Sequence, residues 1–386
     1  MAHRFDAITP GELRAVGHLK WSRHPEAIGA FVAEMDFGTA PPVLDAIRAA
    51  VDGDLLGYLP QAWAERLAEA WCGFARDRYG WDVPPARVRP LGDVVAGLEA
   101  AMKYFSAPGA PVILPTPAYM PFLEVPPWMG REVIEVPMAA HDGDHYFYDL
   151  DALDAAYAAG GSLLVLCNPH NPIGRVLERD ELLAVAEVVD RNGGRVFSDE
   201  IHAPLVYDGR AHVPYASLTA STAAHTVTAV SASKAWNLPG LKCAQLVLSN
   251  DDDVALWDEV GFMAEHGAST LGVVANVAAY ERGGPWLADL LGYLDGNRRA
   301  FGDLLAEHLP EVGYTPPEGT YLSWLDCRRL GLGDHPADHF LAHAGVAFTD
   351  GPASGRAGAG FVRGNLATPR PVLEDTVRRM AGSLRH

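Results

Sequence analysis

The sequence contains very little lysine for a chain of its length. Among its 386 residues and 30 Lys and Arg side chains, the only lysines are Lys20, Lys103, Lys234 and Lys242. Any chemistry that needs a primary amine must therefore use one of these positions. Lys20 lies in a polar N-terminal stretch, and Lys103 has helical spacing beside Tyr104, so we expect both to be solvent-exposed.

Cysteine, long apolar runs and positive charge are also scarce. The 4 cysteines lie far apart without a C-x-x-C pair, which argues against a disulfide framework or a zinc ribbon and predicts a reducing, cytoplasmic location. We see no secretory h-region and no run near the ~20 apolar residues that span a bilayer, so no membrane partner is expected. A net charge of −19 disfavours nucleic acid as a partner. The 15 histidines lack metal-ligand spacing, so no metal site is expected.

Several well-known motifs are missing as well, namely G-x-G-x-x-G after a strand, G-x-x-x-x-G-K-[ST], H-E-x-x-H and G-x-S-x-G. Their absence removes the usual support for dinucleotide, P-loop, zincin and α/β-hydrolase functions. Residues 87–250 instead alternate short apolar, β-prone runs with helical patterns. The runs do not alternate polar and apolar residues, which predicts an α/β fold with a largely parallel sheet buried on both faces.

The order of the predicted helices and strands changes near residue 288. A long amphipathic helix is expected over Trp286–Leu309, followed by short strands in TYLSWLD and GFVRGNLA. We therefore predict a large domain over residues 46–287. A smaller domain would combine residues 1–45 with residues 288–386.

Polar and aromatic residues follow the apolar runs where a parallel sheet places its ligand site. Lys234 follows one run, and its segment alone suits Schiff-base chemistry and an ordinary loop equally well. Asp199 follows another run and is suited to pair with a pyridinium nitrogen, while Asn171 and Tyr119 offer an amide and an aromatic face. Gly92–Val94 begin a helix, where free N–H groups favour a phosphate. Together these residues describe a site for pyridoxal 5'-phosphate.

The motifs that carry these residues resemble a known family. They read NPHNPIG, SDEIH, S-x-S-K-x-x-N-L-x-G-L, EGTYL and GFVRGNLATPR. The chain resembles the fold-type I pyridoxal-phosphate enzymes of the class I/II aminotransferase superfamily, over residues 20–370. It looks more narrowly like the bacterial cystathionine β-lyase or C–S lyase branch, because of VAEMDF, the GW after Tyr79, SDEIH and the final ATPR. The resemblance implies an aminotransferase-like fold with a mostly parallel seven-stranded sheet sandwiched by helices, plus a smaller α+β domain.

The resemblance also implies roles for the residues around the cofactor ring. Lys234 matches the Schiff-base lysine that removes the substrate Cα proton. Asp199 matches the partner of the pyridine nitrogen, and a neighbouring cation should depress its pKa. Asn171 and His202 would face the 3-oxygen, with histidine at 202 where ordinary aminotransferases usually have tyrosine. Tyr119 matches the aromatic residue that stacks on the ring.

Further roles concern the phosphate and the substrate. Ser231 and the backbone amides of Gly92, Asp93 and Val94 would hold the phosphate, and Lys242 would offset the Asp93 carboxylate beside it. Tyr58 resembles the tyrosine that reaches the phosphate of the neighbouring subunit, which implies a homodimer. Arg363 matches the arginine that binds the substrate α-carboxylate through two parallel hydrogen bonds.

The expected activity is β-elimination from an L-cysteine S-conjugate, giving a thiol, pyruvate and ammonia. An aminotransferase shares the same cofactor residues, so it stays open as the alternative. Decarboxylation and racemisation, which start from the same carbanion, stay open too. A non-catalytic protein on this scaffold is disfavoured, because Lys234, Asp199 and Arg363 are all retained.

Overall fold

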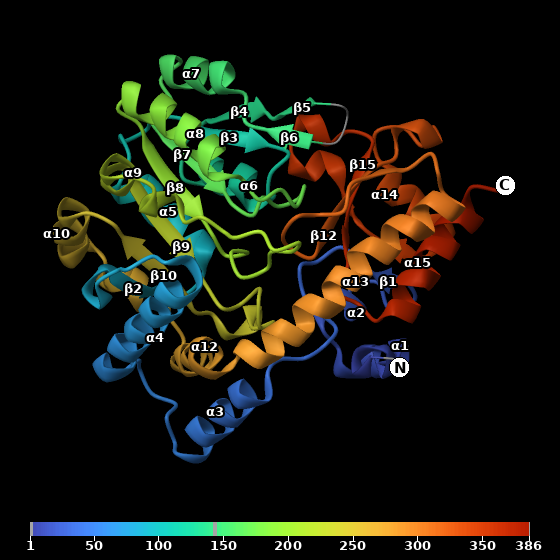
Figure 1. Cartoon of the computed structure of the whole chain (residues 1–386), viewed down its shortest axis with the longest axis horizontal. Helices are drawn as coiled ribbons and strands as arrows, with labels where there is room; N and C mark the ends of the chain where they lie inside the picture. Colours follow the sequence, from blue (N-terminus) through green and yellow to red (C-terminus); the bar gives the residue numbers. More distant parts are fainter. Residues whose placement is uncertain (1–2, 142–144, 386) are drawn as a thin grey trace.

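The computed structural model describes residues 3–141 and 145–385, and its centre is a seven-stranded sheet (Figure 1). The strand order is β2-β10-β9-β8-β7-β3-β4, and neighbours pair in parallel except that β10 runs antiparallel to β2 and β9. The strands are β2 (Val88–Leu91), β3 (Val112–Thr116), β4 (Val133–Pro137), β7 (Leu163–Cys167), β8 (Arg195–Asp199), β9 (Thr226–Val230) and β10 (Ala244–Leu248). The predicted mostly parallel sheet is confirmed.

Helices cover both faces of this sheet, which explains why its strands do not alternate polar and apolar residues. In β7, Leu163 and Val165 face a core shared with α5, whereas Leu164 and Leu166 face a second core shared with α8. The helices of this part are α3 (Pro41–Asp52), α4 (Gln61–Tyr79), α5 (Val94–Tyr104), α6 (Pro121–Trp128), α7 (Leu150–Ala158), α8 (Arg179–Arg191), α9 (Ala220–His225), α10 (Asp251–Val260), α11 (Phe262–Glu265) and α12 (Thr270–Arg282). β5 (Ala139–His141) pairs in antiparallel with β6 (His145–Phe147) outside this sheet.

A second, four-stranded sheet lies toward the C-terminus, in the order β11-β12-β15-β14 (Figure 1). Its strands are β11 (Gly313–Tyr314), β12 (Leu322–Asp326), β14 (Thr349–Asp350) and β15 (Phe361–Asn365), and its helices are α13 (Gly284–His308), α14 (Pro336–His339) and α15 (Arg370–Ser383). All of its paired strands are antiparallel. The long helix expected near residue 286 is α13, and it crosses the predicted boundary at 287/288.

The N-terminal residues pack against this C-terminal part. They form α1 (Pro10–Val16), α2 (Leu19–Ser22) and β1 (Ile28–Gly29), and β1 pairs in parallel with β13 (Val346–Ala347). Leu13, Trp21 and Ile28 belong to one buried cluster with residues of α13 and α15. These contacts agree with the predicted association of residues 1–45 with residues 288–386, although the exact boundaries stay a prediction.

Lys20 contradicts the expectation of a solvent-exposed lysine. Its side chain is 1% exposed, and its Nζ lies 2.8 Å from Asp36 Oδ2 and donates to the carbonyl of Ala367 at 3.2 Å. The other oxygen of Asp36 accepts a hydrogen bond from Trp21 Nε1 at 2.8 Å. Both partners of Lys20 lie far from it in the sequence. The polar residues next to Lys20 therefore give no sign that its side chain is buried in an ion pair.

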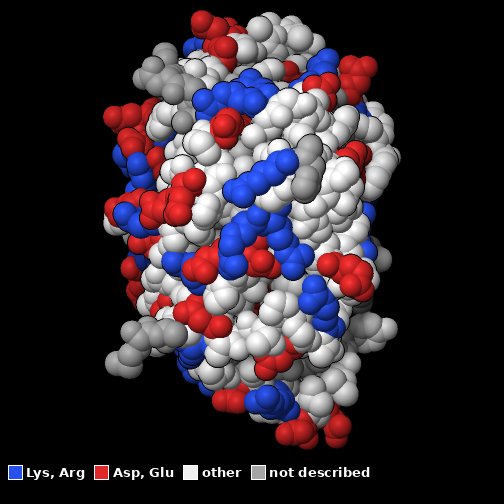
Figure 2. All heavy atoms as spheres, turned by 90° about the vertical axis from the view of Figure 1, so that its right-hand side faces the viewer, with Lys and Arg blue, Asp and Glu red and all other residues white. Residues whose placement is uncertain are grey.

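Figure 2 shows the right-hand side of Figure 1, where basic and acidic side chains are interspersed rather than gathered by sign. All four cysteines are free and buried. Among the residues that the structure describes, no helix is both long and apolar enough to cross a bilayer.

Candidate active site

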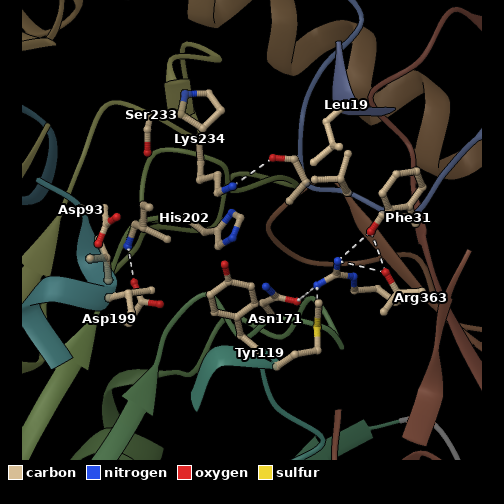
Figure 3. Close-up of a pocket in the computed structure, with 18 of the residues that line it drawn as sticks. Leu19, Phe31, Asp93, Tyr119, Asn171, Asp199, His202, Ser233, Lys234 and Arg363 are labelled. Carbon is tan, nitrogen blue, oxygen red and sulfur yellow. Dashed lines mark hydrogen bonds between the residues drawn. The ribbon is translucent and has the colours of Figure 1, made fainter. Parts of the chain in front are cut away.

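A cavity of about 480 Å³ opens at the carboxyl ends of the parallel strands. This is the edge at which α/β sheets bind ligands. Most of the predicted site residues line it (Figure 3): Gly92, Asp93, Val94, Tyr119, Asn171, Asp199, His202, Lys234, Lys242 and Arg363.

Each side of the cavity comes from the end of a different strand. Gly92 follows β2, Tyr119 follows β3, Asn171 follows β7, and Asp199 ends β8. Lys234 lies in the loop after β9. Lys242 precedes β10, whose antiparallel direction brings its first residue to the same edge. Arg363 comes from β15 of the second sheet, so the cavity lies between the two sheets.

Lys234 presents its amine to the cavity (Figure 3). Its Nζ donates a hydrogen bond to the carbonyl of Ala33 at 2.9 Å. Burial lowers the pKa of Lys234 to about 8, with the positive charge of Arg363 acting in the same direction. This amine therefore loses its proton near neutral pH far more readily than an exposed lysine does, which suits it to act as a nucleophile and a base.

Asp199 is 4% exposed and lies on the same side of the cavity as Asp93 (Figure 3). Its Oδ1 accepts the N–H of Ile201 at 3.0 Å, and Cys167 Sγ lies 3.8 Å from Oδ2. Burial raises the pKa of Asp199 to about 7, and Lys234 only partly opposes this effect. In the chain alone, desolvation outweighs the attraction of Lys234. The expected depression of the pKa requires the cation of the cofactor ring and stays a prediction.

Arg363 is a buried cation, and it has no acidic partner among the residues that the structure describes. Its guanidinium donates to the carbonyl of Phe31 at 2.8 Å, to Thr349 Oγ1 at 3.2 Å and to Asn171 Oδ1 at 3.2 Å. No carboxylate of the described residues pairs with it, and its Nε has no hydrogen-bond partner. Burial lowers the pKa of Arg363 to about 10, so it stays charged. Such a site favours a carboxylate ligand.

His202 and Tyr119 also line the cavity. His202 is 2% exposed, and its Nδ1 has no hydrogen-bond partner among the described residues. Burial lowers the pKa of His202 well below its ordinary value, so its ring is neutral. Its edge meets the ring of Tyr321 with centroids 6.1 Å apart. Tyr119 presents its aromatic ring toward the middle of the cavity in Figure 3.

Asp93 and Lys242 form an ion pair where a phosphate is expected. Lys242 Nζ lies 2.8 Å from Asp93 Oδ2, while Asp93 Oδ1 caps α5 by accepting the N–H of Ala96 at 2.9 Å. The pKa of Asp93 is lowered overall, because its bonds to Lys242 and Ala96 outweigh the opposing effect of burial. The lysine therefore offsets the carboxylate, as expected from the sequence.

Two predicted residues lie elsewhere. Ser231 is buried outside the cavity lining, and its hydroxyl donates to the carbonyl of Cys243 at 2.7 Å. Ser233, two residues later, lines the cavity instead and was not singled out from the sequence. Tyr58 is 87% exposed, away from the cavity of its own chain, beside His266 with ring centroids 5.5 Å apart.

One wall of the cavity consists of N-terminal residues, and of these only Ala33 is expected from the sequence to face the substrate. Its members in the lining are Leu19, Arg23, His24, Phe31, Val32 and Ala33. The VAEMDF motif covers only the end of this wall. Nothing in the local pattern of residues 19–24 indicates that they meet a cavity, because α2 is brought there by the buried pair of Lys20 and Asp36.

Comparison with known proteins agrees with this geometry. The model of the family described as aminotransferase class I and II matches residues 31–378. The cystathionine beta-lyase of Corynebacterium glutamicum is 37% identical over 379 residues, covering 97% of this chain and 98% of the relative. The cystathionine beta-lyase PatB of Bacillus subtilis is 32% identical, covering 95% of this chain and 96% of the relative. The PLP-bound C–S lyase of Staphylococcus hominis superposes with a TM-score of 0.91 at 29% identity, covering 99% of both chains. The chain belongs to the aminotransferase class I and II family.

Proposed function

We propose that this protein is a pyridoxal-phosphate-dependent C–S β-lyase that cleaves an S-substituted L-cysteine. The observation that carries the proposal is the pairing of two groups in one cavity. Lys234 offers a buried amine that faces the cavity and whose pKa burial lowers to about 8, and Arg363 offers a cation that no carboxylate of the described residues occupies. Relatives that are named cystathionine beta-lyase support the choice of reaction.

The residues of the cavity fit pyridoxal 5'-phosphate. This cofactor supplies an aldehyde that binds amines covalently and a pyridinium ring that withdraws electrons from the substrate Cα. Lys234 would bind the aldehyde carbon. Asp199 would accept a hydrogen bond from the ring N–H, and a cation there would counter the burial that raises its pKa. The unpartnered Nδ1 of His202 and the amide of Asn171 would face the 3-oxygen.

The phosphate would lie at the N-terminus of α5. The N–H groups that begin this helix, together with its dipole, favour an anion there. Lys242 pairs with the Asp93 carboxylate, so the phosphate dianion would not lie beside an unpaired negative charge. Ser233 lines the same cavity and is the hydroxyl we assign to this end in place of Ser231.

The chain's own groups would then carry the substrate through β-elimination. Arg363 would bind the α-carboxylate, which fixes the orientation of the Cα–H bond. Lys234 Nζ, once released by the substrate amine, would take the Cα proton, and the Cβ–S bond would break with its electron pair leaving on sulfur. Water completes the balance: the conjugate plus one water gives one thiol, one pyruvate and one ammonia.

An aminotransferase would use the same residues but requires a keto acid to complete each turnover. The test is to supply S-substituted cysteines to the holoenzyme with no keto acid and to quantify pyruvate and free thiol. We expect repeated turnovers with equal amounts of both products. Turnover that starts only after a keto acid is added would refute the lyase and favour the aminotransferase.

We further propose that the protein acts as a homodimer in which Tyr58 reaches the neighbouring site. Tyr58 and Leu56 are exposed next to Phe262 and Met263 of α11, which are 69% and 74% exposed, so apolar surface gathers beside it. Sedimentation should give twice the chain mass, and Tyr58→Phe should weaken cofactor binding without changing that mass. A monomeric holoenzyme would contradict the proposal.

We place the protein in the cytoplasm. Its four cysteines are all unpaired thiols, as is usual in a reducing compartment. Fractionation of cells that produce the protein, with periplasmic and membrane markers as controls, tests the assignment.

A further inference from the structure

The cavity extends beyond the residues that the cofactor and the amino-acid portion of a substrate require. In Figure 3, Asp93 and Asp199 lie at one end of the cavity, and Leu19, Phe31 and Arg363 lie at the other. We call this second part the outer end. It is lined by Leu19, Arg23, His24, Phe31, Val32, Phe348 and Thr349. A substrate whose α-carboxylate binds Arg363 would direct its sulfur substituent into this space.

The outer end is built on an anchored piece of backbone. Within and beside α2, Lys20 and Trp21 point inward and are each 1% exposed, where both bind the Asp36 carboxylate. Leu19 and Arg23, on the other side of this short helix, reach the cavity. The Cα position of Arg23 is therefore fixed by the buried pair one turn earlier, although its side chain is exposed.

Phe31 joins this end to the carboxylate anchor. Its carbonyl accepts a hydrogen bond from Arg363 at 2.8 Å. Its ring lies close to two basic side chains: the guanidinium carbon of Arg23 is 5.6 Å from the ring centroid, and the imidazole of His24 is nearly perpendicular to the ring with centroids 5.7 Å apart. Cation–π contact leaves the N–H edges of a guanidinium free for a second ligand.

The charges of the lining residues are divided between the two ends. The carboxylates in the lining are Asp93, which is paired with Lys242, and Asp199, and both lie at the cofactor end (Figure 3). The outer end has two basic residues and no acidic one. Arg23 forms no ion pair with any residue in the ranges that the structure describes.

We propose that the outer end selects conjugates whose leaving thiol carries an anionic group, a carboxylate in the simplest case. Arg23 and His24 would donate hydrogen bonds to this group, while Leu19 and Phe31 contact the apolar chain between it and the sulfur. The proposal rests on the proposed lyase function, because it concerns the substituent on sulfur. It makes Arg23 the main residue that determines specificity for the leaving group.

The test compares acids with their neutral amides. S-(2-carboxyethyl)-L-cysteine and S-(3-carboxypropyl)-L-cysteine are each paired with the corresponding primary amide, which has nearly the same shape. The readout is the acid-to-amide ratio of kcat/KM for pyruvate release by the holoenzyme. We expect the better acid to be preferred about tenfold, as one charge-assisted hydrogen bond provides. In Arg23→Gln the ratio should fall to about one.

A variant's cofactor content and stability affect kcat/KM for the acid and for the amide equally. They therefore cancel in the acid-to-amide ratio. Arg48→Gln is the matched control, because Arg48 is an exposed arginine of α3 outside the cavity lining. We expect it to keep the wild-type ratio. An acid-to-amide ratio near one in the wild type, or a tenfold ratio that persists in Arg23→Gln, would overturn the proposal.

A binding measurement separates this proposal from the proposed reaction. 2-Aminoheptanedioate is the analogue of the carboxyethyl conjugate with methylene in place of sulfur, so it cannot eliminate a thiol. Its dissociation constant, followed by the change in the cofactor's absorption spectrum, should be about tenfold lower than that of its ω-amide. If this preference and its loss in Arg23→Gln are found while no conjugate yields pyruvate, the outer end is supported and the lyase function fails. If pyruvate forms and neither measurement shows a preference, the outer-end proposal alone fails.

Discussion

Because its pKa is raised, we expect Asp199 to strengthen cofactor binding but to lower the free energy of unfolding of the cofactor-free protein. Its pKa rises from 3.8 to about 7 because the carboxyl is buried. Asp199→Asn removes the ionisable group and keeps an oxygen that can accept the N–H of Ile201. We therefore expect the cofactor-free variant to be more stable than the wild type at pH 8 and to bind the cofactor less tightly.

The magnitude follows from linkage between protonation and folding. Between pH 4 and pH 7 the folded state binds more protons at this residue than the unfolded state, so wild-type stability falls as the pH rises. A pKa difference of this size corresponds to about 4 kcal/mol at pH 8. The new amide would face the thiol of Cys167 less favourably, at a cost of about 1 kcal/mol. The expected net gain in the free energy of unfolding is about 3 kcal/mol above pH 7.

The assay is urea unfolding of both cofactor-free proteins at pH 8 and near pH 4. The difference should be close to its full size at pH 8 and should nearly vanish near pH 4, where the wild-type carboxyl is protonated in the folded state and about half protonated in the unfolded state. A variant that is less stable than the wild type at pH 8 would refute the reasoning. So would a difference of equal size at both pH values.

Three further substitutions test other parts of the account. Lys20→Met should lower the free energy of unfolding by about 3–5 kcal/mol in urea, because it leaves Asp36 charged and buried without its partner; a loss below about 1 kcal/mol would contradict this. Lys242→Gln should weaken pyridoxal-phosphate binding about tenfold by leaving Asp93 uncompensated, with no such effect on pyridoxal, which lacks the phosphate; equal losses for both ligands would show that the lysine serves another purpose. Arg363→Lys should lower kcat/KM about a hundredfold, because an ammonium cannot form the two parallel bonds; near-normal kcat/KM would exclude Arg363 as the carboxylate anchor.

The parts of the site that follow strands could be predicted from the sequence. Tyr119, Asn171, Asp199 and Lys234 each lie within a few residues of an apolar run, and the parallel sheet brings the ends of those runs to one edge. The helix expected to begin at Gly92–Val94 is likewise found, as α5. At these positions the apolar runs in the sequence and the strand order of the folded sheet both indicate the same location for the site.

The parts that depend on distant pairing could not be predicted. Lys20 is buried by Asp36 and by the carbonyl of Ala367, which lies in the second sheet's part of the chain, so its local sequence carries no signal of burial. Arg23 meets the cavity only because that pair fixes α2. Ser231 shows a different limit. Its hydroxyl is taken by the carbonyl of Cys243 across the neighbouring strand, and a motif match cannot reveal such a bond.

The central claim is that Lys234 alone among the four lysines binds the cofactor. Its most direct test is borohydride reduction of the holoenzyme, which makes the lysine–cofactor bond permanent, followed by digestion and mass spectrometry of all four lysine peptides. We expect one phosphopyridoxyl group per chain, on the peptide that contains Lys234, and no label in Lys234→Ala. A label on Lys20, Lys103 or Lys242 in the native enzyme would contradict it.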